Sequence, residues 1–265
     1  MEPDLDLVRR LVRKIARSEL LPRFAGVSGR IKHDGSTVTE ADLVMQERLQ
    51  ETLVRHWPDI EFFGEEMTSD EHERLLAGAG KPLWCLDPLD GTSNYASGLP
   101  FFCVSLALLV GGESLLAVVY DPVRDECFSA MRGAGAWANG SPLCAPTSPL
   151  PAMGRSIAVV DFKRLEGRLA ARLGSRPPYG SQRNFGSSAL EWCWLARRRF
   201  HLYLHGGQKL WDYAAGSLVL AEAGGYAATL EGEPVLARTP APRSVVAAPD
   251  AASFQVWSEW LAQFS

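Results

Sequence analysis

Two aspartates, Asp87 and Asp90, stand three residues apart at the end of an apolar run, in the stretch Trp84-Cys-Leu-Asp-Pro-Leu-Asp-Gly-Thr92. Pro88 lacks a backbone donor and has a fixed φ, which favours the end of regular strand pairing, and Gly91 permits a tight turn. Carboxylates on such a turn, beside the free amides of a helix start, can hold a hard cation and a phosphate together. Asp-Pro or Asp-Gly alone is typical of an ordinary turn. The whole stretch behind a buried strand predicts a cation- and phosphate-binding turn.

Two further acidic positions fall at the ends of expected elements. Glu65 follows a short strand over residues 60–63, and Asp212 lies in the first turn of a helix over residues 211–223. Taken alone, Glu65 suits a solvated turn, and Asp212 suits the positive end of a helix dipole. Together with the two aspartates of the turn they offer four oxygen donors without matching His or Cys, which favours magnesium or manganese over zinc. Such a set suits two-metal phosphate hydrolysis.

The chain up to residue 148 is predicted to form two helices followed by an antiparallel meander. The expected helices cover residues 4–21 and 39–53, and the expected strands cover residues 60–63, 83–86, 104–110, 115–120, 127–131 and 135–138. Thr39 and Asp42 fit a capping box, which gives Asp42 a structural alternative to any catalytic role. Thr92 or Ser93 fits the cap of a helix after the aspartate turn.

Beyond a segment with four prolines, residues 142–151, the pattern alternates between strands and helices. The expected strands cover residues 157–160, 200–204, 226–230 and 245–248, and the expected helices cover residues 162–173, 188–196, 211–223 and 250–264. Ser188 and Glu191 fit a capping box at the start of the second of these helices. We expect one domain over residues 1–265, with an N-terminal half over 1–148 and a C-terminal half over 149–265.

Composition limits the partners and the compartment. The 265 residues carry a net charge of −4, which gives no basic footprint for nucleic acid. No apolar run approaches the roughly 20 residues that span a bilayer, and the acidic start Met1-Glu-Pro-Asp4 lacks the apolar region of a signal peptide. The five cysteines are odd in number and form no C-x-x-C pair, which argues against a disulfide framework or a zinc site. We expect a cytoplasmic protein without nucleic-acid or membrane partners.

Three motifs resemble the signatures of the inositol monophosphatase superfamily, the lithium-sensitive, magnesium-dependent phosphatases related to fructose-1,6-bisphosphatase. They are Glu65-Glu66, Asp87-Pro-Leu-Asp-Gly-Thr92, and Trp211-Asp-Tyr-Ala-Ala-Gly216 with Glu222-Ala-Gly-Gly225. The resemblance extends over residues 30–225. It implies an α/β (α+β) layered sandwich with alternating α-β-α-β-α layers, an antiparallel N-terminal sheet and a more mixed C-terminal sheet. It also implies a homodimer.

The resemblance implies two to three Mg²⁺ ions, with Mn²⁺ as a substitute. The side chains of Glu65 and Asp87 and the backbone carbonyl of Leu89 would ligate the first ion. Asp87, Asp90 and Asp212 would hold the second. Glu65 would also help to bind a third, looser ion.

Catalytic roles follow from the same resemblance. Glu65 and Thr92 would orient the attacking water, and Lys32 and Asp42 match the mobile loop of the family and its supporting hydrogen-bond network. The amides of Gly91 and Thr92 would take phosphate oxygens. The implied reaction is in-line attack on phosphorus by a metal-activated water, without a phosphoenzyme.

The substrate is implied to be a small phosphorylated metabolite. The implied substrate-binding positions are Asp90, Gly91, Thr92, Gly186, Ser187, Ser188, His205 and Asp212. His205 stands where animal inositol monophosphatases have a glutamate that contacts inositol hydroxyls, so substrate contact and a packing role are both open for it. We expect activity on inositol monophosphate or a related polyol or sugar phosphate. The alternatives are a 3′(2′),5′-bisphosphate nucleotidase, a histidinol-phosphate phosphatase, and a regulatory binding protein on the same fold.

Overall fold

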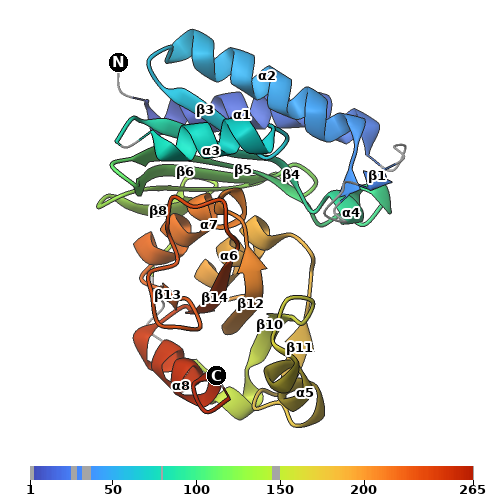
Figure 1. The fold of residues 1–265 in the computed structure, drawn as a ribbon, viewed down its shortest axis with the longest axis vertical. Coiled ribbons are helices and arrows are strands. Elements are labelled where there is room, and N and C mark those ends of the chain that lie inside the picture. The colour runs from blue at the N-terminus through green and yellow to red at the C-terminus, as the bar shows by residue number, and fades with distance from the viewer. Residues whose placement is uncertain (1–2, 25–28, 32–36, 79, 145–149, 265) are drawn as a thin grey trace.

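Helices and sheets alternate in layers in the computed structural model of the protein (Figure 1). The structure describes residues 3–24, 29–31, 37–78, 80–144 and 150–264. A helix pair, a seven-stranded sheet, a second helix pair, a five-stranded sheet and a last helix pair follow one another. This order confirms the expected α-β-α-β-α sandwich. Lys32 lies outside the described residues.

The first layer consists of α1 (Leu5–Glu19) and α2 (Glu40–His56), which pack on one face of the seven-stranded sheet. A short 3-10 turn, η1 (Leu21–Arg23), and a two-stranded ribbon of β1 (Arg30–Ile31) and β2 (Thr37–Val38) lie between them in the chain. Thr39 caps α2 as predicted, because its hydroxyl accepts the backbone N–H of Ala41 at 3.2 Å. In return, Oδ2 of Asp42 accepts the backbone N–H of Thr39 at 2.7 Å and its hydroxyl at 2.6 Å. The cap therefore fixes the buried carboxylate of Asp42 at the start of the helix.

The seven-stranded sheet is antiparallel except for its first pair, β3 and β4, which run parallel. Its strands are, in spatial order, β3 (Glu61–Gly64), β4 (Leu83–Asp90), β5 (Cys103–Val110), β6 (Glu113–Asp121), β7 (Glu126–Met131), β8 (Gly135–Ala138) and β9 (Ser141–Pro142). A helix that the sequence did not predict, α3 (Ser69–Ala77), connects the parallel pair, and Thr68 and Glu71 form its capping box. Every residue of β4 is buried, because helices cover both faces of the sheet there.

The five-stranded sheet is mixed, as expected for the C-terminal half. Its spatial order is β11 (Ser181–Arg183), β10 (Ile157–Asp161), β12 (Leu202–Gln208), β14 (Arg243–Ala248) and β13 (Tyr226–Ala228). The first three strands run parallel, and the last two pair antiparallel. The outer face is covered by α5 (Gly167–Ser175) and α8 (Ala251–Leu261), with the short turn η2 (Met153–Arg155) beside α8.

Two helices, α6 (Ser188–Ala196) and α7 (Leu210–Glu222), fill the layer between the sheets. Both are apolar on most sides, which suits helices that are buried between two sheets. The hydroxyl of Ser114 in β6 donates to the carbonyl of Ala214 at 2.8 Å, which ties α7 to the first sheet. The core around these helices contains side chains of both expected halves of the chain.

Three local predictions are wrong. The helix expected over residues 162–173 begins at Gly167, because Oδ1 of Asp161 accepts the backbone N–H of Lys163 at 2.7 Å and forms a turn. Ser188 and Glu191 form no capping box, because the N-cap of α6 is Ser187, which has no side-chain cap bond. The N-cap of α4 (Thr92–Ala96) is Gly91 rather than Thr92 or Ser93.

No helix in the described ranges combines the length and the apolar character that crossing a membrane requires.

Close packing of α6 against α7 depends on Gly216. A Cβ atom added there would lie 2.4 Å from Cβ of Trp192, so Gly216→Ala forces the two buried helices apart. We expect it to lower the free energy of unfolding by about 1–3 kcal/mol, measured by denaturant unfolding. Gly174 in α5 is the matched control, because a Cβ there meets nothing within 4 Å. Gly174→Ala should be neutral or gain up to about 1 kcal/mol, and equal destabilisation by both variants would contradict the packing argument.

Candidate active site

The parallel pairing of β3 and β4 brings two of the predicted metal carboxylates together. Gly64 pairs with Leu86, so the next residues, Glu65 and Asp87, lie side by side at the carboxyl end of this parallel pairing. The backbone N–H of Glu65 donates to the carbonyl of Leu86 at 3.0 Å, which fixes this register to the end of the strand. Asp212 reaches the same place from the first turn of α7, and Oδ2 of its carboxylate accepts the backbone N–H of Lys209 at 2.7 Å.

The aspartate turn is a bulge in β4 rather than its end. Pairing with β5 continues to Asp90 and shifts register between Asp87 and Asp90. Oδ1 of Asp87 accepts the backbone N–H of Leu89 at 3.0 Å, which closes the bulge. Gly91 follows with φ +94°, and a Cβ there would lie 3.0 Å from the carbonyl oxygen of Phe101. Only glycine fits this crowded left-handed position, from which α4 begins.

Asp90 is held by the start of α6. Its Oδ2 accepts the hydroxyl of Ser187 at 2.8 Å and the backbone N–H of Ala189 at 2.6 Å, and its Oδ1 accepts the backbone N–H of Ser188 at 3.1 Å. Burial raises the pKa of Asp90, and these hydrogen bonds from the start of α6 oppose the shift, because free amides at a helix N-terminus favour a carboxylate. The arrangement also explains why Ser187 gives no cap to its own helix.

Burial and like charge raise the pKa values of the clustered carboxylates. The pKa of Asp87 lies well above its usual range because the group is buried and because Glu65 and Asp90 repel its charge. The pKa of Asp212 is raised well above its usual range by burial, then by the charges of Asp90 and Glu65. A cluster of this kind favours a bound proton or a bound cation, because either removes the repulsion.

Thr92 and Asp42 form a hydrogen-bonded pair behind the cluster. Oγ1 of Thr92 lies 3.0 Å from Oδ1 of Asp42 and 2.9 Å from the carbonyl oxygen of Leu89, and it can donate to either. Asp42 is fully buried, and burial raises its pKa to about 6, although hydrogen bonds from Thr39 oppose the shift. The lone pairs of the Thr92 hydroxyl are therefore available to accept a hydrogen bond from the pocket side.

A cavity of about 230 Å³ opens over these groups. It is lined by Thr37, Glu65, Asp87, Leu89, Asp90, Gly91, Thr92, Ser93, Asp161, Lys163, Arg164, Gly186, Ser188, His205 and Asp212. Of the predicted site residues, Ser187 and Asp42 lie behind this wall, where they bond Asp90 and Thr92. All the other described ones line the cavity.

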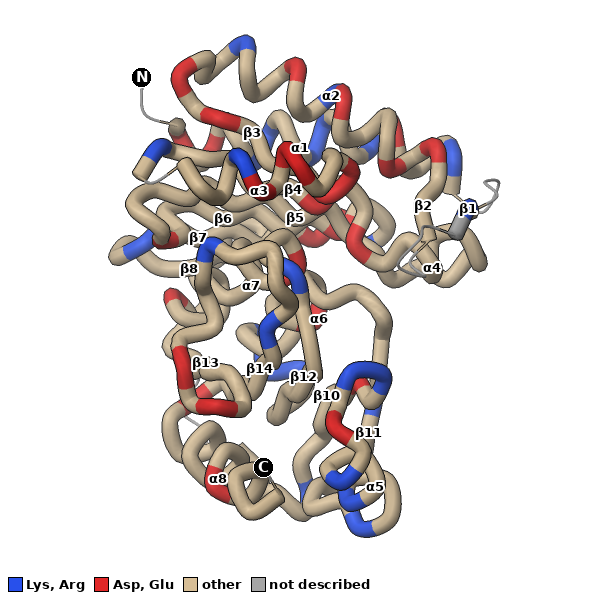
Figure 2. Tube along the Cα trace, in the orientation of Figure 1, with Lys and Arg blue, Asp and Glu red and all other residues tan. Residues whose placement is uncertain are grey.

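The sequence analysis missed the cationic side of the cavity, which the segment after β10 supplies. Asp161, Lys163 and Arg164 lie there, and Figure 2 shows basic positions between β10 and α5. Lys163 and Arg164 fall within the helix expected over residues 162–173, which in fact begins at Gly167. The signal that could have found them is a polar run directly after a buried parallel strand, since such strand ends meet at one edge of a sheet.

His205 is held as a neutral group within this side of the cavity. Its Nδ1 accepts the backbone N–H of Gly207 at 3.1 Å, which places the proton on Nε2, 3.5 Å from Oδ2 of Asp161. Burial lowers its pKa to about 4, although the charge of Asp161 opposes the shift. His205 therefore offers one N–H donor to the cavity and no positive charge at neutral pH.

A glycine pair in β12 makes room for Arg164. A Cβ at Gly206 would lie 2.1 Å from the carbonyl oxygen of Arg164, and pairing with β14 shifts register between His205 and Gln208. Nη1 of Arg164 donates to the carbonyl of Gly207 at 2.5 Å. The bulged strand and the loop after β10 thus fix each other at the wall of the cavity.

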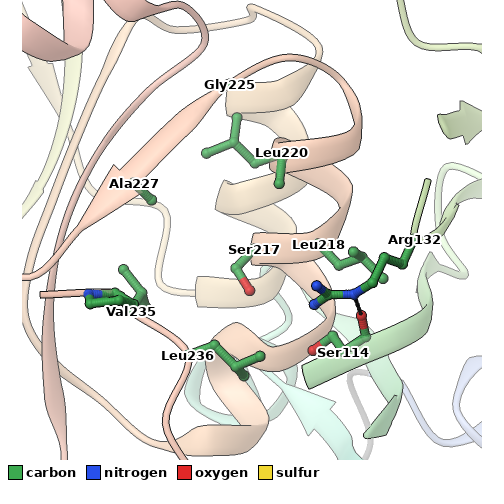
Figure 3. A pocket seen from close by; sticks show the side chains of 11 residues that line it. Ser114, Arg132, Ser217, Leu218, Leu220, Gly225, Ala227, Val235 and Leu236 are labelled. Atoms are coloured by element: carbon green, nitrogen blue, oxygen red, sulfur yellow. Dashed lines mark hydrogen bonds between the residues drawn. The ribbon is translucent and has the colours of Figure 1, made fainter. Parts of the chain in front are cut away.

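A second cavity, of about 210 Å³, lies along the later turns of α7 (Figure 3). Its lining is mostly apolar or small, and the guanidinium of Arg132 is its charged group. Nε of Arg132 donates to the carbonyl of Ser114 at 2.9 Å, and Nη1 pairs with Glu113 at 2.8 Å. The lining holds no carboxylate, so this cavity does not have the chemistry of a divalent-cation site.

The donor set of the first cavity fits hard divalent cations. Glu65, Asp87, Asp90 and Asp212 offer carboxylate oxygens, and Leu89 offers a backbone carbonyl. Among the described residues, no three His, Cys, Asp or Glu side chains are already placed so that they could hold a metal ion together. The fit rests on donor chemistry and on the raised pKa values of the buried carboxylates, which a cation would offset.

The layered sandwich and its acidic cavity define a protein of the inositol monophosphatase fold class. An IMPase from Thermotoga maritima has the same fold with a TM-score of 0.82 and 25% identity, and the match covers 98% of this chain and 99% of that chain. The SuhB extragenic suppressor protein of Bartonella henselae has the same fold at a TM-score of 0.81 and 24% identity, covering 97% of each chain.

The chain belongs to the inositol monophosphatase family, whose model matches residues 3–263. It is 34% identical to inositol monophosphatase 1 of Solanum lycopersicum over 204 residues, which cover 74% of this chain and 73% of that protein. It is also 34% identical to the Nus factor SuhB of Xylella fastidiosa over 212 residues, 73% of this chain and 69% of that protein. Relatives of the chain are thus named both as phosphatases and as a Nus factor.

The charge cluster predicts a stabilising effect of divalent cations. A cation bound at about 100 times its Kd stabilises the fold by about 2.7 kcal/mol, which corresponds to a rise in Tm of about 5–10 °C. Asp87→Asn removes a proposed ligand and one of the repelling charges. We expect this variant to melt higher than the wild type without cations, and to lose most of the shift on adding Mg²⁺.

The stability of the fold without cations should also depend on pH, because the same carboxylates titrate. Because the pKa of Asp87 and of Asp212 is raised in the folded state, stability without cations should fall as pH rises through those raised values.

Asp59→Asn, at an exposed turn, is the control for the Mg²⁺ experiment and should keep the wild-type Mg²⁺ shift. A full Mg²⁺ shift in Asp87→Asn would contradict the assignment of the cation site.

Proposed function

We propose that the protein is a Mg²⁺-dependent phosphoric monoester hydrolase that acts on inositol monophosphate or a related polyol or sugar phosphate. The observation that carries the proposal is the convergence of Glu65, Asp87, Asp90 and Asp212 on one cavity, beside the turn at Gly91. The carboxylates suit hard cations, and the first amides of α4 have no partner inside that helix and suit phosphate oxygens. Family membership supports a hydrolase.

Two to three Mg²⁺ ions, or Mn²⁺ in their place, would neutralise the phosphate and lower the pKa of a water molecule. Glu65, Asp87 and the carbonyl of Leu89 would hold one ion. Asp87, Asp90 and Asp212 would hold another, and Glu65 would share a third. The bonds from α6 to Asp90 fix the orientation of that carboxylate before any ion binds.

Thr92 and Asp42 would guide the proton of the attacking water. The hydroxyl of Thr92 would accept a hydrogen bond from the water while donating its own hydrogen to Oδ1 of Asp42. With a pKa of about 6, Asp42 is ionised at neutral pH and can accept that hydrogen bond. The water would thereby be oriented toward phosphorus, opposite the leaving alcohol. Lys32, which we also predict in this loop network, lies outside the described residues.

The alcohol of the substrate would lie against Gly186, Ser188 and His205. His205 can donate one hydrogen bond to a hydroxyl and does not replace the acceptor pair of a glutamate. Lys163 and Arg164 add positive charge to this side of the cavity. They favour a substrate with a second anionic group, as in a 3′(2′),5′-bisphosphate nucleotidase, and disfavour the cationic side chain of histidinol phosphate.

Phosphate release from a substrate panel tests the proposal. The panel contains myo-inositol 1-phosphate, adenosine 3′,5′-bisphosphate, fructose 1,6-bisphosphate, histidinol phosphate and an aryl phosphate, each with and without Mg²⁺. We expect Mg²⁺-dependent release that favours one phosphorylated polyol or sugar, and at least a 100-fold loss of kcat in Asp87→Asn, because the variant lacks a shared ligand. Absence of release from every compound would refute the proposed activity.

Lys163 provides a separate test of the cationic wall. Among the described residues its ammonium makes no ion pair, so Lys163→Ala should not disturb the fold. We expect KM for the bisphosphates to rise about fivefold, since one partly solvated charge contact contributes about 1 kcal/mol, and KM for inositol monophosphate to change little. Lys14→Ala on α1 is the control. An equal rise in KM for all substrates would argue against a second anion contact.

A regulatory role is the second candidate, because relatives of this chain include proteins named as Nus factors. Asp87→Asn separates the two functions, since it should abolish turnover and leave partner binding intact. We further propose that the protein is a cytoplasmic homodimer. Its five cysteines are free, as suits a reducing compartment, and analytical ultracentrifugation at micromolar concentration would show a 58 kDa species, twice the 29.0 kDa chain, if the dimer forms.

A further inference from the structure

A fully enclosed carboxylate lies behind the alcohol side of the cavity and has no role in the proposed chemistry. It belongs to Glu191 in α6, whose exposed fraction is 2%. Oε1 accepts the backbone N–H groups of Phe185 at 2.9 Å and Gly186 at 3.1 Å, and Oε2 accepts the hydroxyl of Tyr203 at 3.0 Å. Three donors directed at one buried carboxylate satisfy its ionised form.

A chain of donors holds this carboxylate in place. Nε1 of Trp192 donates to Oε1 of Gln208 at 2.9 Å, and Nε2 of Gln208 donates to the hydroxyl of Tyr203 at 2.6 Å. The hydroxyl of Tyr203 must therefore give its own hydrogen to Glu191. Each of these hydrogen bonds is donated toward Glu191. The donors keep this order only while Glu191 accepts the hydrogen of Tyr203.

The turn at Phe185 and Gly186 is clamped from two sides. Glu191 binds its N–H groups from the core, and Nδ2 of Asn94 in α4 donates to the carbonyl of Phe185 at 2.7 Å. The carbonyl oxygen of Gly186 would lie 3.3 Å from a Cβ added at Gly91. The turn is therefore packed against the proposed phosphate site while Gly186 faces the cavity.

We propose that Glu191 is a positioning residue that, in its ionised form, holds the turn at Phe185 and Gly186 against the phosphate site and so sets substrate affinity. The proposal rests on the proposed phosphatase function and deepens it. Glu191 touches neither the cavity nor the proposed cation ligands, and it acts only through the backbone of the turn. Its loss should therefore raise KM more than it lowers kcat.

Protonation of Glu191 should have the same effect as its replacement by glutamine. Burial raises the pKa of Glu191 to about 7, and the hydrogen bonds from Phe185 and Tyr203 oppose the shift. The titratable groups that face it are Tyr203 from β12 and, at longer range, Asp90 from β4. A protonated Glu191 or a glutamine must donate toward Tyr203, which already receives a hydrogen bond from Gln208, so the chain of donors is broken.

The test compares KM of Glu191→Gln with that of the wild type from pH 6 to pH 9, with the best substrate of the panel at saturating Mg²⁺. At pH 8 and above we expect KM of the variant to be about tenfold higher, the loss that follows from weakening one charged hydrogen bond. The ratio should fall toward one at pH 6, where the wild type is itself protonated. Taking the ratio cancels the titration of the substrate phosphate. A ratio that is constant with pH, or one at every pH, overturns the proposal.

Hydrogen exchange of the peptide that contains Phe185 and Gly186 gives a readout without catalysis. We expect faster exchange of these amides in Glu191→Gln than in the wild type at pH 8, and unchanged exchange in the control Glu259→Gln on the exposed face of α8. Unchanged exchange in Glu191→Gln overturns the proposal. If the wild type releases no phosphate from the panel, the proposed function fails, while the exchange result still decides the role of Glu191.

Discussion

The bond between Asp90 and the first turn of α6 is the interaction on which the rest of the site depends. It joins the last residue of β4 to the helix that opens the C-terminal part of the core, so one carboxylate connects both halves of the chain. The same contact brings Gly186 and Ser187 against Gly91. The phosphate turn and the alcohol side of the cavity are therefore placed by one buried carboxylate and the three hydrogen bonds that it accepts from the start of α6.

Charge repulsion is the second constraint. Buried carboxylates that face one another destabilise the folded chain, and their raised pKa values express that cost. The parallel pairing of β3 with β4 and the tight packing of α7 against α6 nevertheless hold them together. The carboxylate cluster thus lowers the folding stability of the protein and at the same time favours divalent cations. Such a loss of stability is common where a binding site must be arranged before its ligand binds.

Local patterns in the sequence were sufficient for most helices and strands and for the capping box at Thr39, whereas the layers followed from the resemblance to a family. Local patterns were insufficient where a side chain bonds far along the chain. Ser187 and Glu191 carry the residue types of a helix start, but contacts with Asp90 and Tyr203 decide their roles. Lys163 and Arg164 were missed because a helical pattern covered a loop. Asp161 ends β10, and only the parallel pairing of β10 with β12 brings it to His205. Tertiary contacts of this range leave no periodic trace in a single sequence.

The glycine at position 206 allows the two sides of the cavity, the carboxylates and the basic loop after β10, to change independently in evolution. The carboxylates stand on strands and a helix whose packing tolerates little variation, whereas Lys163 and Arg164 stand on a loop. That loop is accommodated because Gly206 leaves the space that a Cβ would fill. As long as the glycine is kept, the loop can exchange one set of charges for another without disturbing the cation site. A lineage could thus acquire a new metabolite preference through a few loop substitutions while the hydrolytic chemistry stays unchanged.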